Sequence, residues 1–196
     1  AGSIFGYKQS GHITSVGYQM YCDLLAEELI RKRTLKTQSY EPTKITCTVV
    51  IEIPPSYIEN PTIRLSYYHK ISTVYNLPGI IKLEAELVDV FGQVPYELNN
   101  LLNLARVKLL YGNSEISKII ISESEVSIVV CANEKEGEMG SVVSNVLTYS
   151  SEEVEGVYLK DPTKESVRIL FNLKEDLNPI SFLIEIVGLF SYENIT

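Results

Sequence analysis

Residues 80–110 read IIKLEAELVDVFGQVPYELNNLLNLARVKLL and predict two helices that meet at a tight corner. Apolar side chains of the first helix recur at helical spacing and predict a packed face, formed by Ile80, Ile81, Leu83, Leu87, Val88 and Phe91. Gly92 suits the left-handed residue that ends a helix, and Pro95 suits a first helical position. The second helix carries its own apolar face, formed by Leu98, Leu101, Leu102, Ala105 and Leu109, and ends before Gly112. A short corner between two amphipathic helices predicts that they pack as a pair.

The polar back of the first helix carries the candidate contact residues. Glu86 and Asp89 are three residues apart, so their carboxylates are expected to project side by side from one helical surface. Such a surface is either a solvated face, a contact for a partner, or an acid–base pair. The solvated face is the plainest of these interpretations.

Composition and charge restrict the class of protein. The chain has 196 residues, of which 45% are hydrophobic and 21% charged, typical of a globular domain with one sizeable core. Residues 1–42 carry five basic and four acidic side chains, whereas residues 43–196 carry 12 basic and 21 acidic, a net charge of −9. An acidic surface repels phosphate backbones, so the larger part is not expected to bind nucleic acid by itself. A partner bound through charge is expected to be basic.

The order of elements predicts an α+β domain over residues 43–196. An alternating strand is predicted over residues 44–53, and a helix capped by Asn60 follows the pair Pro54-Pro55. Residues 76–79 are expected to break this helix before the central pair begins. After Gly112, strands are predicted over 116–121, 126–131, 154–159 and 166–171, the first two joined as a hairpin through residues 122–125. Short helices are predicted from about 141 to 149 and after Asn178. Strands and helices that do not alternate regularly favour a small, mainly antiparallel sheet with packed helices.

Residues 1–42 are expected to form a separate unit of loop, helix and linker. Gly2, Gly6 and Gly11 allow tight backbone turns around Gln9, and a helix is expected from about His12 to Lys32. The polar, aperiodic residues 34–42 are the predicted linker.

No catalytic or metal site is predicted. His12 and His69 are the only histidines, and neither has a second histidine or a cysteine at ligand spacing. The three cysteines are far apart in the sequence, so we expect thiols in a reducing cytoplasm rather than disulfides. No apolar run approaches the roughly 20 residues of a membrane helix, and no signal peptide is expected at the first residues.

Two stretches carry a resemblance to a known family. Residues 1–21 follow the pattern AGxxxGxxQSGHIxxVGxxxY, which resembles the end of the translocation motif shared by bacterial transcription-repair coupling factors and the helicase RecG. The resemblance places Gly2, Gly6, Gln9 and Gly11 on the motif's glycines and glutamine. Residues 85–108 follow AELVDVFGxxPxxxxNLLxxAxxK, which resembles the C-terminal domain of the coupling factors, as does EIPPSYIENPTIRLSYYHKI at residues 52–71.

The resemblance implies a non-catalytic regulatory fragment of a DNA-repair translocase that displaces stalled RNA polymerase in nucleotide excision repair. The last domain of that family is α+β and packs against an N-terminal UvrB-like module, where it masks the surface that recruits UvrA. The resemblance places Glu86 and Asp89 on two carboxylates expected to meet arginines of that module. The parent protein is expected to use ATP and Mg²⁺ and to bind double-stranded DNA, whereas the fragment needs no cofactor, binds no membrane and is cytoplasmic.

Two departures and two alternatives accompany this hypothesis. Val90 stands where the family usually has arginine, and Pro78-Gly79 falls in a stretch that is usually helical. The first alternative is a motor-coupling element of a superfamily 2 helicase, in which residues 1–35 contact DNA through Gln9 and the basic end of the helix. The second is a hydrolase that depends on Glu86.

Overall fold

The computed structural model describes residues 43–112, 116–131, 138–149, 151–160, 162–163 and 166–190. Its strands are β1 (Lys44–Cys47), β2 (Ile116–Ile121), β3 (Glu125–Cys131), β4 (Val154–Lys160) and β5 (Ser166–Leu173). Its helices are α2 (Pro61–Thr73), α3 (Leu77–Phe91), α4 (Tyr96–Tyr111), α5 (Glu138–Thr148) and α6 (Pro179–Glu185), and a 3₁₀ helix covers Ile186–Phe190. The fold is α+β, as predicted.

The five strands form one mixed sheet in the order β1-β2-β3-β5-β4. The pair β1–β2 is parallel, and the other three pairs are antiparallel. The predicted turn between β2 and β3 is present, because the Ser122 amide donates to the Glu125 carbonyl at 2.9 Å. The prediction of a mainly antiparallel sheet is therefore confirmed.

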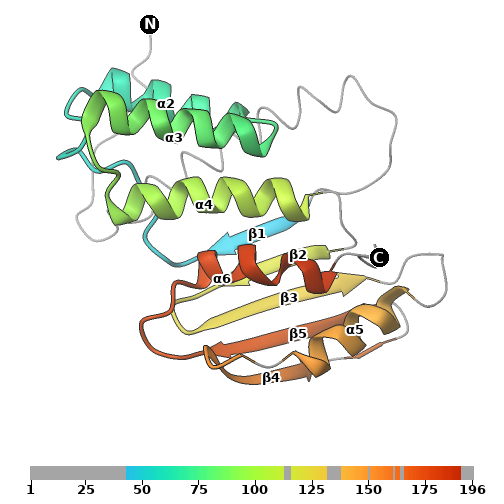
Figure 1. The fold of residues 1–196 in the computed structure, drawn as a ribbon. Coiled ribbons are helices and arrows are strands. Elements are labelled where there is room, and N and C mark those ends of the chain that lie inside the picture. The colour runs from blue at the N-terminus through green and yellow to red at the C-terminus, as the bar shows by residue number, and fades with distance from the viewer. Residues whose placement is uncertain are drawn as a thin grey trace, which may run out of the picture.

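One face of the sheet forms the hydrophobic core. Ile119, Ile128 and Ile169 pair across β2, β3 and β5, and all three side chains are fully buried. Figure 1 shows α6 and α5 lying over this sheet, with α4 beside β1 and the hairpin of α2 and α3 stacked beyond α4. Phe171 of β5 and Phe182 of α6 meet with ring centroids 5.3 Å apart. Burial of these aromatic and branched side chains joins the helical layer to the sheet.

Helices α3 and α4 form the predicted pair, and the corner between them contains Gly92. The φ angle of Gly92 is 87°, in the left-handed region that favours glycine, and its amide donates to the Val88 carbonyl at 2.9 Å. The Tyr57 hydroxyl lies 3.0 Å from the Leu87 carbonyl and 2.9 Å from that of Gly92. The side chain of Tyr57 thus stabilises the last turn of α3, where backbone carbonyls lack helical partners. Pro95, predicted as a first helical residue, instead precedes α4 as its cap.

The prediction of a strand over residues 44–53 is wrong beyond Cys47. Residues 48–53 keep the alternation, with Val49, Ile51 and Ile53 buried. The Thr48 amide donates the last hydrogen bond to β2, at the Ile121 carbonyl, and beyond it the segment pairs with no described strand. Side chains replace the missing partners in part. Asn100 Nδ2 donates to the Val50 carbonyl at 3.1 Å, and the Ile53 amide donates to the Tyr68 hydroxyl at 2.8 Å. The segment therefore connects the sheet to the helical layer.

The predicted break over residues 76–79 is also wrong in its extent. Helix α3 begins at Leu77, with Asn76 as its cap and Pro78 and Gly79 in its first turn. Asn76 Oδ1 accepts from the Gly79 amide at 2.8 Å, which satisfies a donor that has no helical partner. A proline in the first turn removes only an amide that would be unpaired in any case. Pro78-Gly79 therefore starts a helix here and does not interrupt one.

Within the described part of the chain, no helix is both long enough and apolar enough to cross a membrane.

Candidate docking site on helix α3

Helix α3 has one buried apolar face and one exposed apolar stripe. Ile80, Leu83 and Leu87 are buried, as predicted. The exposed stripe, called the α3 stripe below, consists of Leu77, Ile81, Ala85 and Val88. These residues follow one another at intervals of four, four and three positions, so they share one helical face.

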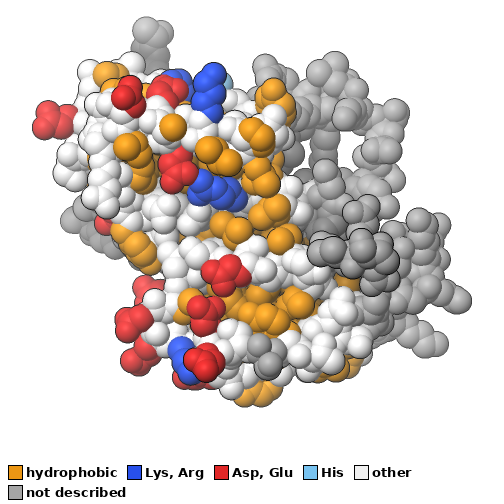
Figure 2. All heavy atoms as spheres, in the orientation of Figure 1, with side chains coloured by type: hydrophobic (Ala, Val, Ile, Leu, Met, Phe, Trp, Pro, Cys, Tyr) orange, Lys and Arg blue, Asp and Glu red, His pale blue; other side chains and the backbone are white. Residues whose placement is uncertain are grey.

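The expectation that Ile81 and Val88 pack into the core is wrong. Their side chains are 61% and 48% exposed, because the buried face turns toward α2 and α4 and leaves this side of α3 uncovered by described residues. Figure 2 shows hydrophobic side chains reaching the surface over the region of α3 and α4. A continuous exposed apolar stripe is a common mark of a protein-binding surface.

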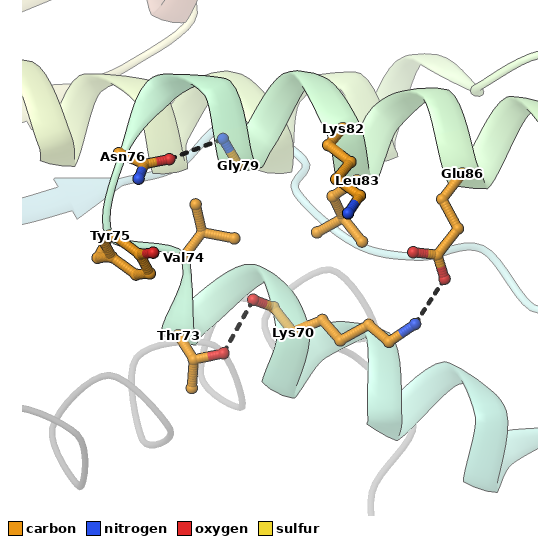
Figure 3. A pocket seen from close by; sticks show the side chains of 9 residues that line it. All are labelled: Lys70, Thr73, Val74, Tyr75, Asn76, Gly79, Lys82, Leu83 and Glu86. Atoms are coloured by element: carbon orange, nitrogen blue, oxygen red, sulfur yellow. Dashed lines mark hydrogen bonds and ion pairs between the residues drawn. The ribbon is translucent and has the colours of Figure 1, made fainter.

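Glu86 does not point away from the fold, because it binds α2. Its Oε1 accepts hydrogen bonds from the Tyr67 hydroxyl at 2.9 Å and from Lys70 Nζ at 2.6 Å. Lys70 Nζ also lies 4.4 Å from the centroid of the Tyr67 ring. Figure 3 shows the side chain of Lys70 extending from α2 toward Glu86 on α3. The three side chains thus form a polar link between the two helices.

The pKa shifts follow from this link. The hydrogen bonds from Lys70 and Tyr67 lower the pKa of Glu86, because they stabilise its charged form. The hydrogen bond to Glu86 raises the pKa of Lys70. Burial and the bond to Glu86 raise the pKa of Tyr67, so the phenol keeps the proton that it donates. Glu86 and Lys70 are therefore both charged at neutral pH.

Asp89 is placed differently from Glu86. It is exposed on α3 and has no hydrogen bond or ion pair with the described residues. Asp89 follows Val88 of the α3 stripe, so an exposed carboxylate lies beside the exposed apolar surface. The two carboxylates share a helix, as expected, but Asp89 is the one available to a partner, whereas Glu86 is engaged within the domain.

An ion pair on the other side of the stripe fixes α3 to α4. Arg106 of α4 binds Glu84 of α3 through one guanidinium nitrogen, and its other terminal nitrogen donates to Asn103 Oδ1 at 2.5 Å. Asn103 Nδ2 in turn lies 3.3 Å from Ser181 Oγ of α6. These contacts connect α3 to α4 and α4 to α6. Helix α3, which carries the α3 stripe, is therefore fixed against the rest of the domain.

A shallow hollow of about 310 Å³ lies where α2 turns into α3. Its lining residues are Lys70, Thr73, Val74, Tyr75, Asn76, Gly79, Lys82, Leu83 and Glu86. Figure 3 shows these side chains converging from the two helices and the connecting turn. The hollow is wide open, and Lys70 and Glu86 satisfy each other, so it is not an enclosed pocket for a small molecule.

Nothing in the described residues assembles a catalytic centre around Glu86. Its two partners are a tyrosine and a lysine that hold it in place, and no group of three or more His, Cys, Asp and Glu side chains gathers at metal-binding distance in the described ranges. Cys47 and Cys131 are free thiols. The predicted translocation-motif residues Gly2, Gly6, Gln9 and Gly11 lie outside the described residues.

The partners of the site were not identifiable from the sequence pattern. Lys70 and Glu86 are 16 positions apart, and Glu84 and Arg106 are 22 apart, so no helical spacing relates them. The only available signal was the apolar character of Leu77, Ile81 and Val88, which resembles that of core residues. Val90, where the sequence departs from the family pattern, is 58% exposed on α3.

Comparison with known proteins finds similarity to one family domain and to proteins that share a name. Residues 47–140 match the model of the TRCF domain. The transcription-repair-coupling factor of Buchnera aphidicola subsp. Acyrthosiphon pisum (strain APS) is 27% identical over 191 residues, covering 95% of this chain and 23% of that protein. That of Bacillus subtilis (strain 168) is 28% identical over 141 residues, covering 71% of this chain and 12% of that protein. The chain thus spans less than a quarter of the length of these relatives.

A solved structure shares the fold. The crystal structure of the C-terminal domain of a transcription-repair coupling factor superposes with a TM-score of 0.60, over 78% of this chain and 92% of that chain. The two sequences are 15% identical, so this likeness bears on the fold alone.

Proposed function

Because this chain belongs to the transcription-repair coupling factor family and carries its TRCF domain, we propose that residues 43–196 are a regulatory docking domain without a reaction of its own. The domain binds the UvrB-like module of its parent protein and covers the surface that recruits UvrA. The parent protein is a DNA translocase that acts on stalled RNA polymerase and uses ATP and Mg²⁺.

The α3 stripe beside Asp89 is the observation that carries this proposal. Leu77, Ile81 and Val88 expose apolar area that the domain does not bury against its described residues. Asp89 adds a carboxylate at the rim, and the net charge of −9 over residues 43–196 favours a basic partner. An apolar centre with a charged rim is the usual anatomy of a protein interface.

The balance of forces predicts a reversible contact. An exposed ion pair contributes about 0–1 kcal/mol, so Asp89 alone cannot hold two modules together. Burial of the α3 stripe supplies the larger part, at about 25 cal/mol for each Å² of apolar surface removed from water. Such a contact is strong when the two modules are joined in one chain, where the effective concentration is high, and weak enough to open.

Calorimetric titration of this chain into the UvrB-like module of a coupling factor tests the proposal. Ile81→Ser together with Val88→Ser is expected to abolish measurable binding, and Asp89→Lys is expected to weaken it. Leu147→Ser on α5 and Glu175→Lys in the β5–α6 loop are matched controls, because both side chains are exposed far along the chain from α3. Binding that survives the α3 substitutions as well as the controls would place the contact elsewhere.

The effect of Glu86→Lys on binding can be interpreted only when it is compared with the variants above. It reverses a charge, but it also breaks the bonds to Tyr67 and Lys70 and places two lysines together. A loss of binding in this variant alone, with Asp89→Lys unchanged, would indicate that the orientation of α2 matters rather than the charge of α3.

A further inference from the structure

Ala85 lies at the centre of the exposed side of α3, between an apolar flank and a charged flank. Ile81 and Val88 lie four residues before and three residues after it, whereas Lys82 and Asp89 lie three before and four after. At about 100° per residue, the first pair falls on one side of Ala85 and the second pair on the other. All five residues are exposed. A small side chain is thus surrounded by two apolar and two oppositely charged ones.

The two charged side chains of this flank are available to a partner. Lys82 and Asp89 form no hydrogen bond or ion pair within the ranges that the structure describes. They are seven residues apart, which is about 10.5 Å along the helix axis. The other acids of the helix are engaged, since Glu86 binds α2 and Glu84 binds α4. The flank therefore offers one cation and one anion in a fixed order.

The order of these side chains is self-complementary in an antiparallel helix pair. When Ala85 of one copy faces Ala85 of the other, Lys82 of each copy lies opposite Asp89 of the other, offset by only about 1.5 Å along the axis. Ile81 and Val88 lie opposite each other with an equally small offset of about 1.5 Å. Each contact thus occurs twice, as in any two-fold interface. The small side chain at the centre allows the two helices to approach to about 8 Å.

A parallel helix pair does not match in this way. A two-fold axis along the helices would place the charged flank of each copy against the apolar flank of the other. Lys82 and Asp89 would then lose water without gaining a partner, which costs free energy. The antiparallel pair also brings the positive end of one helix macrodipole beside the negative end of the other. The order of side chains on α3 therefore selects one orientation.

We propose that the α3 stripe joins two copies of this chain in a two-fold dimer, with the two α3 helices antiparallel and Ala85 at the axis. Figure 1 shows the hairpin of α2 and α3 at one end of the domain, on the side of α4 away from the sheet. The strands therefore do not stand between α3 and a second copy. The dimer uses the stripe assigned above to the module contact, so the two partners exclude each other, but neither proposal requires the other.

The contact is expected to be reversible and weak. Two helical turns from each copy bury less than the roughly 1,200 Å² of a standard interface, so we expect a dissociation constant on the order of 0.1 mM. The apolar pairs of Ile81 with Val88 supply most of the affinity. The exposed ion pairs of Lys82 with Asp89 add little affinity but fix the register and the orientation.

Sedimentation equilibrium of this chain at low salt, from about 10 to 500 µM, tests the proposal. Lys82→Asp and Asp89→Lys each place like charges at both charged contacts, so each is expected to weaken association at least about tenfold. Lys174→Asp and Glu175→Lys are the matched controls, because they make the same changes in net charge at exposed residues of the β5–α6 loop. The controls are expected to change association less than about threefold.

An equal mixture of the two reversed variants provides the sharpest readout. One variant then carries two acids on the flank and the other carries two lysines, so opposite charges meet at both contacts. The mixture is expected to associate at least about tenfold more tightly than either variant alone. The net charge of the chain is −8, so the variants carry −10 and −6 (−8 − 2 and −8 + 2), and attraction between overall charges cannot explain this result.

Two further variants complete the test. Lys82→Asp and Asp89→Lys in one chain restore the self-complementary order and are expected to associate within about threefold of the parent chain. This double variant keeps the test decisive if one of the single variants does not fold. Ile81→Ser together with Val88→Ser is expected to abolish detectable association, whereas Leu147→Ser on α5 is expected to leave it unchanged.

Several results would overturn the proposal. A folded parent chain that stays monomeric at the highest concentration would exclude the dimer. Association that persists in both single variants would place the contact on another part of the chain, and a mixture no tighter than its components would contradict the antiparallel order. Titration of the UvrB-like module separates the two proposals, because binding of the module by a chain that does not dimerise would overturn only the dimer.

Discussion

The Tyr67 hydroxyl donates to Glu86 Oε1 at 2.9 Å and joins α2 to α3 across the surface of the hairpin. Phe91, five residues beyond Glu86, packs on the same tyrosine with ring centroids 5.5 Å apart. Tyr67 therefore contacts α3 through its ring and its hydroxyl together. This relationship separates the roles of the two carboxylates of α3, because Glu86 stabilises the hairpin and Asp89 remains exposed.

The link between Glu86 and α2 makes part of the stability depend on pH. Its pKa is lowered in the folded state from the ordinary value of 4.5, mainly by Lys70 and then by Tyr67. A group with a lowered folded pKa contributes its stability above the unfolded value and loses it as the pH falls through the folded value. We therefore expect Glu86→Gln to be less stable than the parent chain at pH 7, and the difference to shrink as the pH falls below 4.5 toward the lowered pKa of the folded state.

Chemical denaturation at a series of pH values measures that difference. Its size at pH 7 should be below about 1 kcal/mol, because Glu86 and Lys70 are both substantially exposed and screened by solvent. Glu152→Gln is the matched control, since this glutamate is exposed and has no ion pair with the described residues. A pH dependence shared by both variants would contradict the role given to Glu86.

Asn100 is predicted to be a major determinant of stability. Its side chain is fully buried, donates to the Val50 carbonyl at 3.1 Å and accepts from Asn178 Nδ2 at 2.6 Å. Asn100→Ala removes both bonds and leaves a cavity at a fully buried position, while the two partners are partly buried, so we expect a loss of about 1–3 kcal/mol in the free energy of unfolding. Urea denaturation measures it, and Asn145→Ala on the exposed side of α5 should change stability by less than about 0.5 kcal/mol.

Two neighbouring residues of α3, Leu87 and Val88, should differ strongly in how much stability is lost when each is truncated to alanine. Leu87 is fully buried, so Leu87→Ala is expected to cost about 2–5 kcal/mol through lost burial and the cavity left behind. Val88→Ala removes an exposed side chain and should alter stability by less than about 0.5 kcal/mol. Thermal unfolding of the two variants compares them directly. Similar losses in both would mean that the α3 stripe is covered within the chain.

Ser127 offers a substitution that should not destabilise the protein. Its hydroxyl is buried in β3 and has no hydrogen-bond partner. An unsatisfied buried hydroxyl costs free energy, so Ser127→Ala is expected to leave the melting temperature unchanged or to raise it. Ser122→Ala, which removes the 3.1 Å bond to the Glu125 carbonyl at the β2–β3 turn, should lower it. A lower melting temperature for Ser127→Ala would show that its hydroxyl is satisfied in solution.

The sequence alone determined the local elements that depend on neighbours along the chain. The spacing of Leu98, Leu101, Leu102 and Ala105 predicted the buried face of α4, and all four are buried. The turn at Gly92 and the β2–β3 hairpin were also predicted, because their signals are glycine at a left-handed position and short β-branched runs on either side of a polar turn. Periodicity reports which side chains face the same way, and these elements need no more than that.

Tertiary structure alone decided what lies opposite each face. Residues 48–53 alternate as regularly as β1 but have no described strand beside them, since alternation reports the facing of side chains and not their hydrogen-bond partners. Ile81 and Leu87 look alike in the sequence, yet only Leu87 meets another helix. Glu86 binds Lys70 because α2 packs against α3. Lys44 lies beside Lys118, 74 positions away, because of the register between β1 and β2. These partners are set by contacts between distant segments, which no local pattern encodes.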